Sequence, residues 1–190
     1  MPGPRLLIVI ASTRPGRIGL PVAQWFEEHA RAHAGFDVTV ADLAEIGLPF
    51  MDEPSHPRLQ RYTQQHTRDW SATVARSDAF AFVMPEYNHG FTAPLKNAID
   101  FLHNEWRYKP LGLVSYGGVS AGTRAAAMIK PVVTVLGMTP ITDAVSIPFV
   151  HQFLDDDDKI QPNEVMTLAA TALLDELVRL EQALRPLRST

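Results

Sequence analysis

Short apolar runs alternate with longer stretches of helical periodicity along the whole of this 190-residue chain. We predict strands at residues 6–10, 38–40, 78–84, 111–116 and 141–147. The run at 6–10 is continuously apolar, which is typical of a strand buried on both faces of a sheet. Residues 38–40 alternate instead between apolar and polar side chains, which indicates an exposed strand at the edge of the sheet.

Apolar positions that recur every three or four residues predict helices between these strands. The first spans 20–34, with Val22, Phe26 and Ala30 on one face, and the second covers 59–74. The third is capped by Thr92 and has Pro94 in its first turn. Its buried stripe consists of apolar residues at i, i+3, i+4 and i+7, namely Leu95, Ala98, Ile99 and Leu102.

Two further helices follow in the second half of the chain. The helix at 122–136 contains Pro131, which we expect to kink it or split it. Asn163 caps the last helix. Six apolar residues are predicted to line one side of that helix, namely Val165, Leu168, Ala172, Leu173, Leu177 and Leu180.

The alternation of strands and helices predicts an α/β protein, with a parallel sheet covered by helices on both faces. We find no internal repeat and no linker, so residues 1–190 are expected to form a single domain. Ligands of such sheets bind beyond the carboxyl ends of the strands. We therefore expect the ligand-binding residues in the loops after the first, third and fourth strands.

Composition excludes several classes of protein. The formal net charge is −4 and no basic stripe is present, which argues against nucleic acid as a partner. The absence of cysteine removes disulfides, thiolate nucleophiles and cysteine-ligated metals, and it fits a cytoplasmic location. No apolar run is long enough for a membrane helix or a signal sequence, and the histidines lack the paired spacing of a metal site.

The first loop, residues 11–19, runs from a strand into a helix and carries Ser12, Thr13, Arg14, Arg17 and Gly19. The positive end of the helix dipole and free backbone N–H groups would point into it, and arginine donates well to phosphate oxygens. We therefore predict a pocket for a phosphate monoester. The alternative is a solvated turn whose arginines pair with surface acids. The loop lacks both the Rossmann pattern G-x-G-x-x-G and the lysine of a Walker A loop.

The second loop begins with Pro85-Glu86-Tyr87-Asn88, in which Tyr87 could lie against a planar ring. The third loop begins with Ser115-Tyr116-Gly117-Gly118, whose glycines permit close approach of the backbone to a flat ligand. Taken alone, each loop could equally be an ordinary turn. Their expected position at the same edge of the sheet as the first loop favours a shared ligand.

Together these segments, with Lys96-Asn97 following the second, resemble the NADPH-dependent FMN reductase family from about residue 6 to residue 138. The resemblance implies a flavodoxin-like three-layer sandwich with strand order 2-1-3-4-5. It also implies bound FMN, with NADPH or NADH as co-substrate. The FMN phosphate would be held by the first loop, at Ser12, Thr13, Arg14, Arg17, Ile18 and Gly19. The isoalloxazine ring would be flanked by the other two, at Pro85, Glu86, Tyr87, Asn88, Ser115, Tyr116, Gly117 and Gly118.

The activity implied is hydride transfer from NAD(P)H to FMN, followed by electron transfer to a quinone, flavin or similar small acceptor in a ping-pong cycle. No catalytic side chain is assigned, because backbone N–H groups of residues 86–88 and 117–118 could stabilise the reduced ring. Two alternatives stay open: a flavodoxin-type electron carrier, and a non-enzymatic α/β module that binds another phosphate ligand.

Some residues near these loops have roles that the pattern leaves open. His89 departs from the family pattern and is either incidental or a determinant of acceptor choice. Lys96 and Asp100 are spaced to pair on one helix face. Family members are commonly dimers or tetramers, and we expect a homodimer or homotetramer. Phe91, Phe101 and Trp106 would suit the subunit contact, or else the core.

Overall fold

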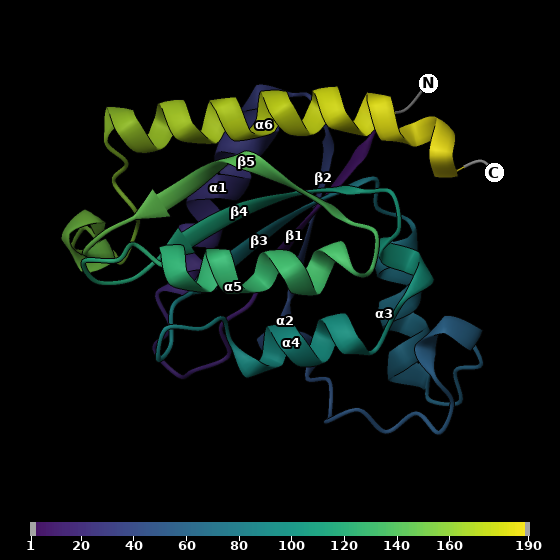
Figure 1. The fold of residues 1–190 in the computed structure, drawn as a ribbon. Coiled ribbons are helices and arrows are strands. Elements are labelled where there is room, and N and C mark those ends of the chain that lie inside the picture. Colours follow the sequence, from purple (N-terminus) through teal and green to yellow (C-terminus); the bar gives the residue numbers. More distant parts are fainter. Residues whose placement is uncertain (1–2, 189–190) are drawn as a thin grey trace.

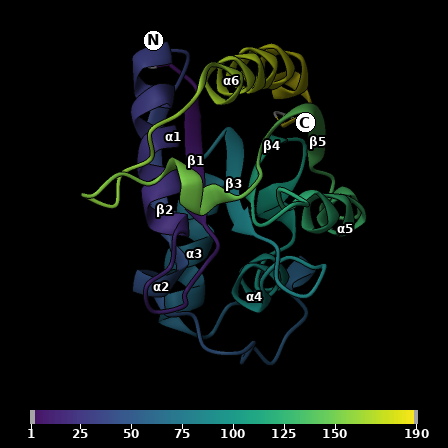
Figure 2. The same ribbon diagram turned by 90° about the vertical axis from the view of Figure 1, so that its left-hand side faces the viewer.

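The computed structural model describes residues 3–188, which form one five-stranded parallel sheet in the order β2-β1-β3-β4-β5. This order confirms the predicted fold class, and β2 lies at an edge as its alternating pattern predicted. The strands, in spatial order, are β2 (Asp37–Asp42), β1 (Arg5–Ile10), β3 (Ala79–Pro85), β4 (Pro110–Tyr116) and β5 (Thr139–Ile147). Because all strands run the same way, their carboxyl ends share one edge, at the left of Figure 1 and facing the viewer in Figure 2.

Helices cover both faces of the sheet and enclose two apolar cores (Figures 1 and 2). One face carries α1 (Gly19–His33) and α6 (Glu164–Leu184). The other carries α3 (Gln65–Ala75), α4 (Ala93–Asp100) and α5 (Thr123–Thr134). A short helix, α2 (Leu43–Ile46), follows β2 at the carboxyl edge. The predicted faces of α1 and α4 are buried, and the side chain of Thr92 caps α4 by accepting a hydrogen bond from the Leu95 N–H.

Two predicted helices differ from the observed ones. The helix predicted at 59–74 begins only at Gln65, because Gln60 adopts a left-handed backbone (φ +52°) that ends a short 3₁₀ turn. The helix that contains Pro131 is not split. The proline removes one hydrogen bond near the end of α5, while Ile129 and Val133 stay buried against the sheet and hold that turn in place.

The apolar side predicted for α6 is only partly correct. Val165 and Leu168 are 74% and 62% exposed, whereas Leu173 and Leu177 are buried as predicted. The buried face also includes Glu181, whose carboxylate pairs with Arg185 and Arg188. A charged residue therefore occupies a position that an apolar periodicity could not identify. Asn163 caps this helix as predicted, accepting from the Met166 N–H at 2.9 Å.

Two of the aromatic residues considered for a subunit contact belong to the core. Phe101 and Trp106 are 0% and 1% exposed, because the chain after α4 folds back beneath α3. The indole N–H of Trp106 donates to the Ile99 carbonyl oxygen. The Lys96–Asp100 pair on α4 forms as predicted, at 2.5 Å. Within residues 3–188, no helix combines the length and the apolar character that crossing a bilayer requires.

Candidate functional site

Three loops that are far apart in sequence meet at the carboxyl edge of the sheet (Figure 2). They enclose a cleft of about 440 Å³. Its walls come from the first, second and third loops, together with a fourth segment after β5. The lining residues are Arg14, Ile18, Pro85, Glu86, Tyr87, Tyr116, Gly117, Gly118, Phe149, Val150, His151 and Gln152.

The first loop joins β1 to α1 and is packed tightly at its base. Ser12 is buried, and its hydroxyl accepts a hydrogen bond from Tyr116 at 3.3 Å. A Cβ on Gly19 would lie only 2.1 Å from the Ser12 Oγ, so the start of α1 can approach β4 only without a side chain there. The N-cap residue of α1, Ile18, has no capping side chain, and Arg14 is exposed beside it. This helix N-terminus therefore offers free N–H groups and a cation to an anion.

Arg17 of the same loop is engaged within the protein. Its guanidinium makes a two-point ion pair with Asp42 at the end of β2 and also donates to the Ser12 carbonyl oxygen. Burial alone would raise the pKa of Asp42, but the hydrogen bonds from Arg17 and from the Ala44 N–H outweigh it and lower that pKa. Arg17 therefore pairs with an acid, as the alternative to phosphate binding predicted, but that acid is buried and not on the surface. A direct contact of Arg17 with phosphate stays a prediction.

The second loop is a tight hairpin closed by two hydrogen bonds between Tyr87 and Gly90, each of 2.9 Å. Its two central residues, Asn88 and His89, have φ values of +50° and +67°. Such backbone is uncommon for residues other than glycine, and it twists the hairpin in the sense that two-residue turns favour. The hairpin leaves Tyr87 40% exposed on the wall of the cleft, as a ring-binding residue would require.

Glu86 connects the second loop to the third. Its carboxylate accepts hydrogen bonds from the Ser120 hydroxyl, from the Arg124 N–H at 3.1 Å and from Arg124 Nε at 2.7 Å. Burial would raise the pKa of Glu86, but these bonds from Ser120 and Arg124 lower it overall. Arg124 also lies 2.8 Å from His89 Nε2, through its Nη1. The two loops expected to flank the ring are thus joined by one ionised side chain.

The third loop is fixed by bonds to β5 and to the segment after it. The Gly117 N–H donates to the Ile147 carbonyl oxygen, and Gly117 and Gly118 accept from the N–H groups of Val150 and Phe149. Gly122 has φ +78°, and a Cβ there would lie 2.8 Å from the Ser115 Cβ. Around Gly118, by contrast, no protein atom lies within 4 Å of such a Cβ. A flat ligand can therefore approach the backbone closely at Gly118.

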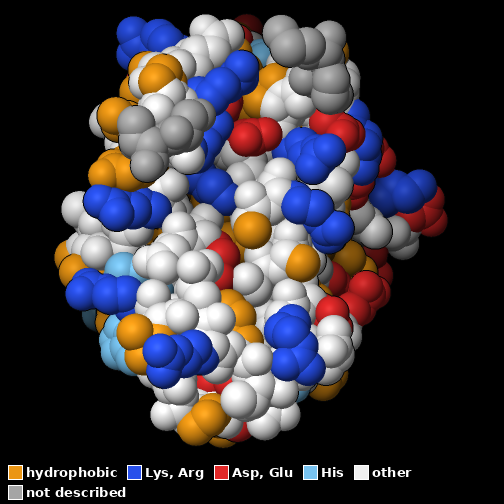
Figure 3. All heavy atoms as spheres, turned by 90° about the vertical axis from the view of Figure 1, so that its right-hand side faces the viewer, with side chains coloured by type: hydrophobic (Ala, Val, Ile, Leu, Met, Phe, Trp, Pro, Cys, Tyr) orange, Lys and Arg blue, Asp and Glu red, His pale blue; other side chains and the backbone are white. Residues whose placement is uncertain are grey.

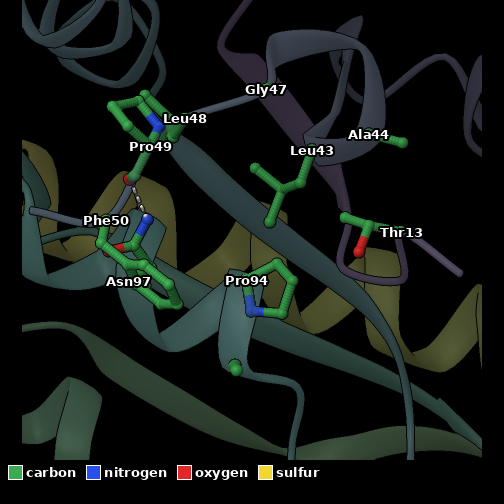
Figure 4. Close-up of a pocket in the computed structure, with 10 residues that line it drawn as sticks. Thr13, Leu43, Ala44, Gly47, Leu48, Pro49, Phe50, Pro94 and Asn97 are labelled. Carbon is green, nitrogen blue, oxygen red and sulfur yellow. Dashed lines mark hydrogen bonds between the residues drawn. The ribbon is translucent and has the colours of Figure 1, made fainter.

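The structure places some predicted site residues on the cleft and others behind it. Ser12, Gly19 and Ser115 form the supporting layer, and Asn88 is at the exposed tip of the hairpin. Thr13 lines a second cavity instead, of about 460 Å³, between α2 and α4 (Figure 4). There the side chain of Asn97 holds the loop after α2 by bonding to the Pro49 oxygen and the Met51 N–H.

Two contributors to this region could not be identified from the sequence. Asp42, the partner of Arg17, carried no signal beyond its place at the end of a strand. Residues 149–152 line the cleft but follow the fifth strand, which was not among the three considered. Phe149 is 50% exposed there, and its backbone is left-handed, with φ +47°.

Basic side chains outnumber acidic ones on the surface at the opposite end of the sheet (Figure 3). Figure 3 shows lysine and arginine side chains spread over this end, with fewer acidic ones between them. Lys109 lies beneath this surface and donates to the carbonyl oxygens of Val74 and Ala75 at the end of α3, and burial lowers its pKa to about 8. Within residues 3–188, no group of three potential metal ligands is present.

Comparison with known proteins identifies the class to which this fold and cleft belong. Residues 4–152 match the model of the NADPH-dependent FMN reductase family, and the chain belongs to that family. It is 39% identical over 149 residues to an NAD(P)H-dependent FMN reductase of Schizosaccharomyces pombe, spanning 76% of this chain and 74% of that protein. It is 25% identical over 174 residues to an FMN-dependent NADPH-azoreductase of Staphylococcus saprophyticus, spanning 90% and 92%.

Among solved structures, the chain is similar to FerB, a flavoenzyme NAD(P)H:(acceptor) oxidoreductase of Paracoccus denitrificans. The TM-score is 0.76 at 19% identity, over 95% of this chain and 98% of FerB, which supports the fold. The prediction of an oxidoreductase family that uses FMN and NAD(P)H is confirmed.

The residues present fit FMN. The uncapped N-terminus of α1 with Arg14 suits a phosphate, and the adjoining cleft, walled by Tyr87 and Gly118, suits a planar ring. The N–H group of Gly118, on the wall of the cleft, has no partner within the described residues, and neither has that of Asn88 at the tip of the hairpin. Glu86, Tyr87 and Gly117 were expected to offer N–H groups as well, but theirs are engaged in bonds that extend β3, close the hairpin and tie down the third loop.

Proposed function

We propose that this protein is an FMN-dependent NAD(P)H oxidoreductase that passes electrons to small planar acceptors. The observation that carries the proposal is the meeting of an uncapped helix N-terminus and a ring-sized cleft at one edge of the sheet. Arg14 and the first turn of α1 would hold the phosphate of FMN. Ile18, Tyr87 and Gly118 would surround its ring.

Bound FMN would supply the redox chemistry, taking a hydride from NAD(P)H and returning two electrons to the acceptor. With a quinone as acceptor, the balance is NAD(P)H + H⁺ + quinone → NAD(P)⁺ + hydroquinone. The protein's part is to position groups and stabilise charge. The free N–H groups of Gly118, on the wall of the cleft, and of Asn88, at the tip of the hairpin, would stabilise negative charge at the ring edge. Glu86 would keep the second and third loops at a fixed separation.

We propose that donor and acceptor use the same open cleft in turn, which gives ping-pong kinetics. The cleft is a single space lined by all three loops and by residues 149–152, which supports a shared binding place for both. The names of the relatives point to acceptors that are conjugated and flat, since one is an FMN reductase and another an azoreductase. Quinones and free flavins belong to the same chemical class.

The test is an absorption spectrum of the purified protein, followed by addition of NADPH without oxygen. Flavin bands that bleach within the mixing time of a manual experiment, and return on addition of a quinone, are the expected result. Bands that persist with NADPH would favour an electron carrier instead. A colourless protein that takes up no added FMN would contradict the cofactor assignment and leave a module for another phosphate ligand.

We also propose that the protein is a homodimer or homotetramer in the cytoplasm. Because Phe101 and Trp106 are buried, a subunit contact would use other apolar residues. Phe50 lines the second cavity, across from Thr13 (Figure 4), and is 87% exposed. Leu59 is 55% exposed. Light scattering after size exclusion would measure the mass. A Phe50→Ser change is expected to lower it if this surface forms the contact, and a monomeric wild-type protein would refute the proposal.

A further inference from the structure

A cavity of about 600 Å³ lies at the amino end of the sheet, where β4 and β5 begin, at the end of the molecule that faces the viewer in Figure 3. We call it the amino-end cavity. Three segments form its walls: the 3₁₀ turn before Gln60, the chain between α4 and β4, and the end of α5 with the turn after it. Its lining includes Arg58, His103, Arg107 and Tyr108, and no acidic residue.

The two arginines of this cavity are not neutralised within the protein. Arg188, at the same end of the sheet, forms ion pairs with Asp78 and Glu181. Within residues 3–188, by contrast, neither Arg58 nor Arg107 forms an ion pair, and both are exposed. The formal net charge of the whole chain is −4, so acids are not scarce. Two arginines on one cavity without a carboxylate therefore indicate a place for an anion.

Glu105 is the acid nearest to these arginines in sequence, and its charge is satisfied elsewhere. It is buried, and its Oε1 accepts from the hydroxyl groups of Tyr62 at 2.8 Å and Ser71 at 2.7 Å. Glu105 lines a neighbouring cavity of about 460 Å³ instead, where Asp78 and Lys109 are also found. That neighbour mixes acids with bases, whereas the amino-end cavity holds basic side chains alone.

Both guanidinium groups are held by neighbours other than acids. Arg107 Nη2 donates to the Tyr108 hydroxyl at 2.7 Å, and Arg58 Nη2 lies 3.4 Å from His103 Nε2. Tyr108 has a left-handed backbone, with φ +58°, fixed by the hydrogen bond of 2.9 Å from its N–H to the Gly137 oxygen. A bulky residue in this region is a strained exception, and such exceptions cluster at functional sites. Because each guanidinium carries five N–H donors, donors remain for a ligand.

The remaining wall, at the end of α5, is apolar. Val135 is 78% exposed, and Leu136 beside it lines the cavity as well. Three carbonyl oxygens of the last turn of α5 accept N–H groups of residues 135–138, so these acceptors are satisfied within the protein. The cavity thus has a basic side and an apolar side, which is the division expected for an organic anion with an apolar body.

We propose that the amino-end cavity binds a phosphate ester with an apolar body, and that Arg58 and Arg107 hold the phosphate. A phosphate monoester carries close to two negative charges at neutral pH, which matches two guanidinium groups, and its oxygens accept their paired N–H bonds. The apolar body would lie on Val135 and Leu136. The inference goes beyond the proposed function and does not rest on it, since the FMN cleft lies at the opposite end of the sheet.

The experiment is isothermal titration of the FMN-loaded protein with 1-naphthyl phosphate, a monoester with an apolar aromatic body. Saturable binding is expected. Arg58→Gln and Arg107→Gln are each expected to raise the Kd about tenfold or more, because each removes charged hydrogen bonds to the phosphate. Both arginines are exposed, so the melting temperature of each variant is expected to stay close to that of the wild type.

The matched control is Arg76→Gln. Arg76 is the C-cap residue of α3 at the same end of the sheet, is exposed, and lines neither the amino-end cavity nor its neighbour. The variant changes the net charge by the same amount and is expected to bind 1-naphthyl phosphate like the wild type. An equal loss in all three variants would show a general effect of charge and overturn the proposed site.

Val135→Ser tests the apolar side of the cavity. It is expected to raise the Kd for 1-naphthyl phosphate several-fold and to leave the Kd for inorganic phosphate unchanged, since only the ester has an apolar body to bury. An unchanged Kd for both would refute that placement. No saturable binding to the wild type, or full binding in both Arg58→Gln and Arg107→Gln, would overturn the inference. A protein that takes up no FMN would refute the proposed function alone, because the arginine variants would still decide this site.

Discussion

Arg17 and Asp42 form a two-point ion pair that joins the first loop to the end of β2. Both side chains are largely buried, at 14% and 7% exposed. Arg14, three residues earlier, is exposed beside the N-terminus of α1 and carries no such partner within the described residues. The two arginines of the loop therefore differ: Arg17 is engaged in shaping the loop, and Arg14 is the one that we propose contacts the phosphate of the ligand.

Arg14→Ala is expected to weaken FMN binding with little effect on folding. A hydrogen bond to a charged group contributes about 1.5–3 kcal/mol, so the Kd should rise roughly 10- to 150-fold. Isothermal titration of the apoprotein with FMN measures this, and thermal unfolding of the apoprotein checks that stability is retained. Equal FMN affinity in wild type and variant would refute the phosphate assignment.

Arg17→Ala is expected to lower stability even without FMN. It removes the Arg17 donor from the Ser12 oxygen and leaves the Asp42 carboxylate with only the Ala44 N–H, at a cost of about 1–3 kcal/mol. Denaturant unfolding of the apoprotein measures the change. The control is Arg31→Ala, which breaks an exposed pair with Glu27 and should cost less than about 1 kcal/mol. Equal stability of the two variants would show that the Arg17–Asp42 pair does not support the fold.

Glu86→Gln is expected to loosen the contact between the second and third loops. The amide keeps the shape of the side chain but loses the ionic bonds to Arg124, so FMN affinity should fall by roughly tenfold. Hydrogen exchange should become faster at residues 86–90 and 117–124. Glu176→Gln breaks a comparable but exposed pair on α6 and should change neither property. Unaltered exchange in Glu86→Gln would refute the bridging role.

Glu53 is expected to make stability depend on pH in the acid range. Although burial would raise its pKa, bonds from the N–H groups of Thr63 and Gln64, just before α3, lower it to about 2. Because the pKa is lower in the folded state, the stabilisation is complete above the unfolded value of 4.5 and is lost as the pH falls towards 2. Denaturant unfolding between pH 6 and pH 2 should show a smaller decline in Glu53→Gln than in the wild type. Parallel curves would contradict this.

The sheet and most of the site could be predicted from the sequence because they depend on local signals. Continuous apolar runs identify buried strands, and Thr92 and Asn163 identify helix starts by capping chemistry. The site loops follow from the rule that parallel strands end at one edge. What could not be predicted depends on contacts between distant residues.

Asp42, for example, becomes the partner of Arg17 only when β2 pairs with β1. Glu181 can be buried in α6 only because two arginines further along the chain neutralise it. Hydrogen bonds to the third loop hold Phe149 at the cleft. Neither its residue type nor the sequence around it predicts a left-handed backbone. Each of these features depends on tertiary contacts, which the spacing of apolar residues along the sequence does not reveal.

Two glycine substitutions distinguish the residues that support the site from the surface on which the FMN ring is expected to lie. In Gly19→Ala, the added methyl group would meet Ser12 Oγ at 2.1 Å and Tyr116 OH at 2.5 Å, inside a packed layer. Such overpacking costs about 1–3 kcal/mol, so both apoprotein stability and FMN binding should fall.

In Gly118→Ala, the methyl group meets no protein atom within 4 Å and would point into free space. The apoprotein should therefore unfold at the same denaturant concentration as the wild type. If the isoalloxazine ring lies against Gly118, the methyl group would collide with it and raise the Kd for FMN. Titration with riboflavin, which lacks the phosphate, should show the same loss, because the phosphate loop is untouched. Unchanged binding of both flavins would place the ring elsewhere in the cleft and leave only the phosphate assignment standing.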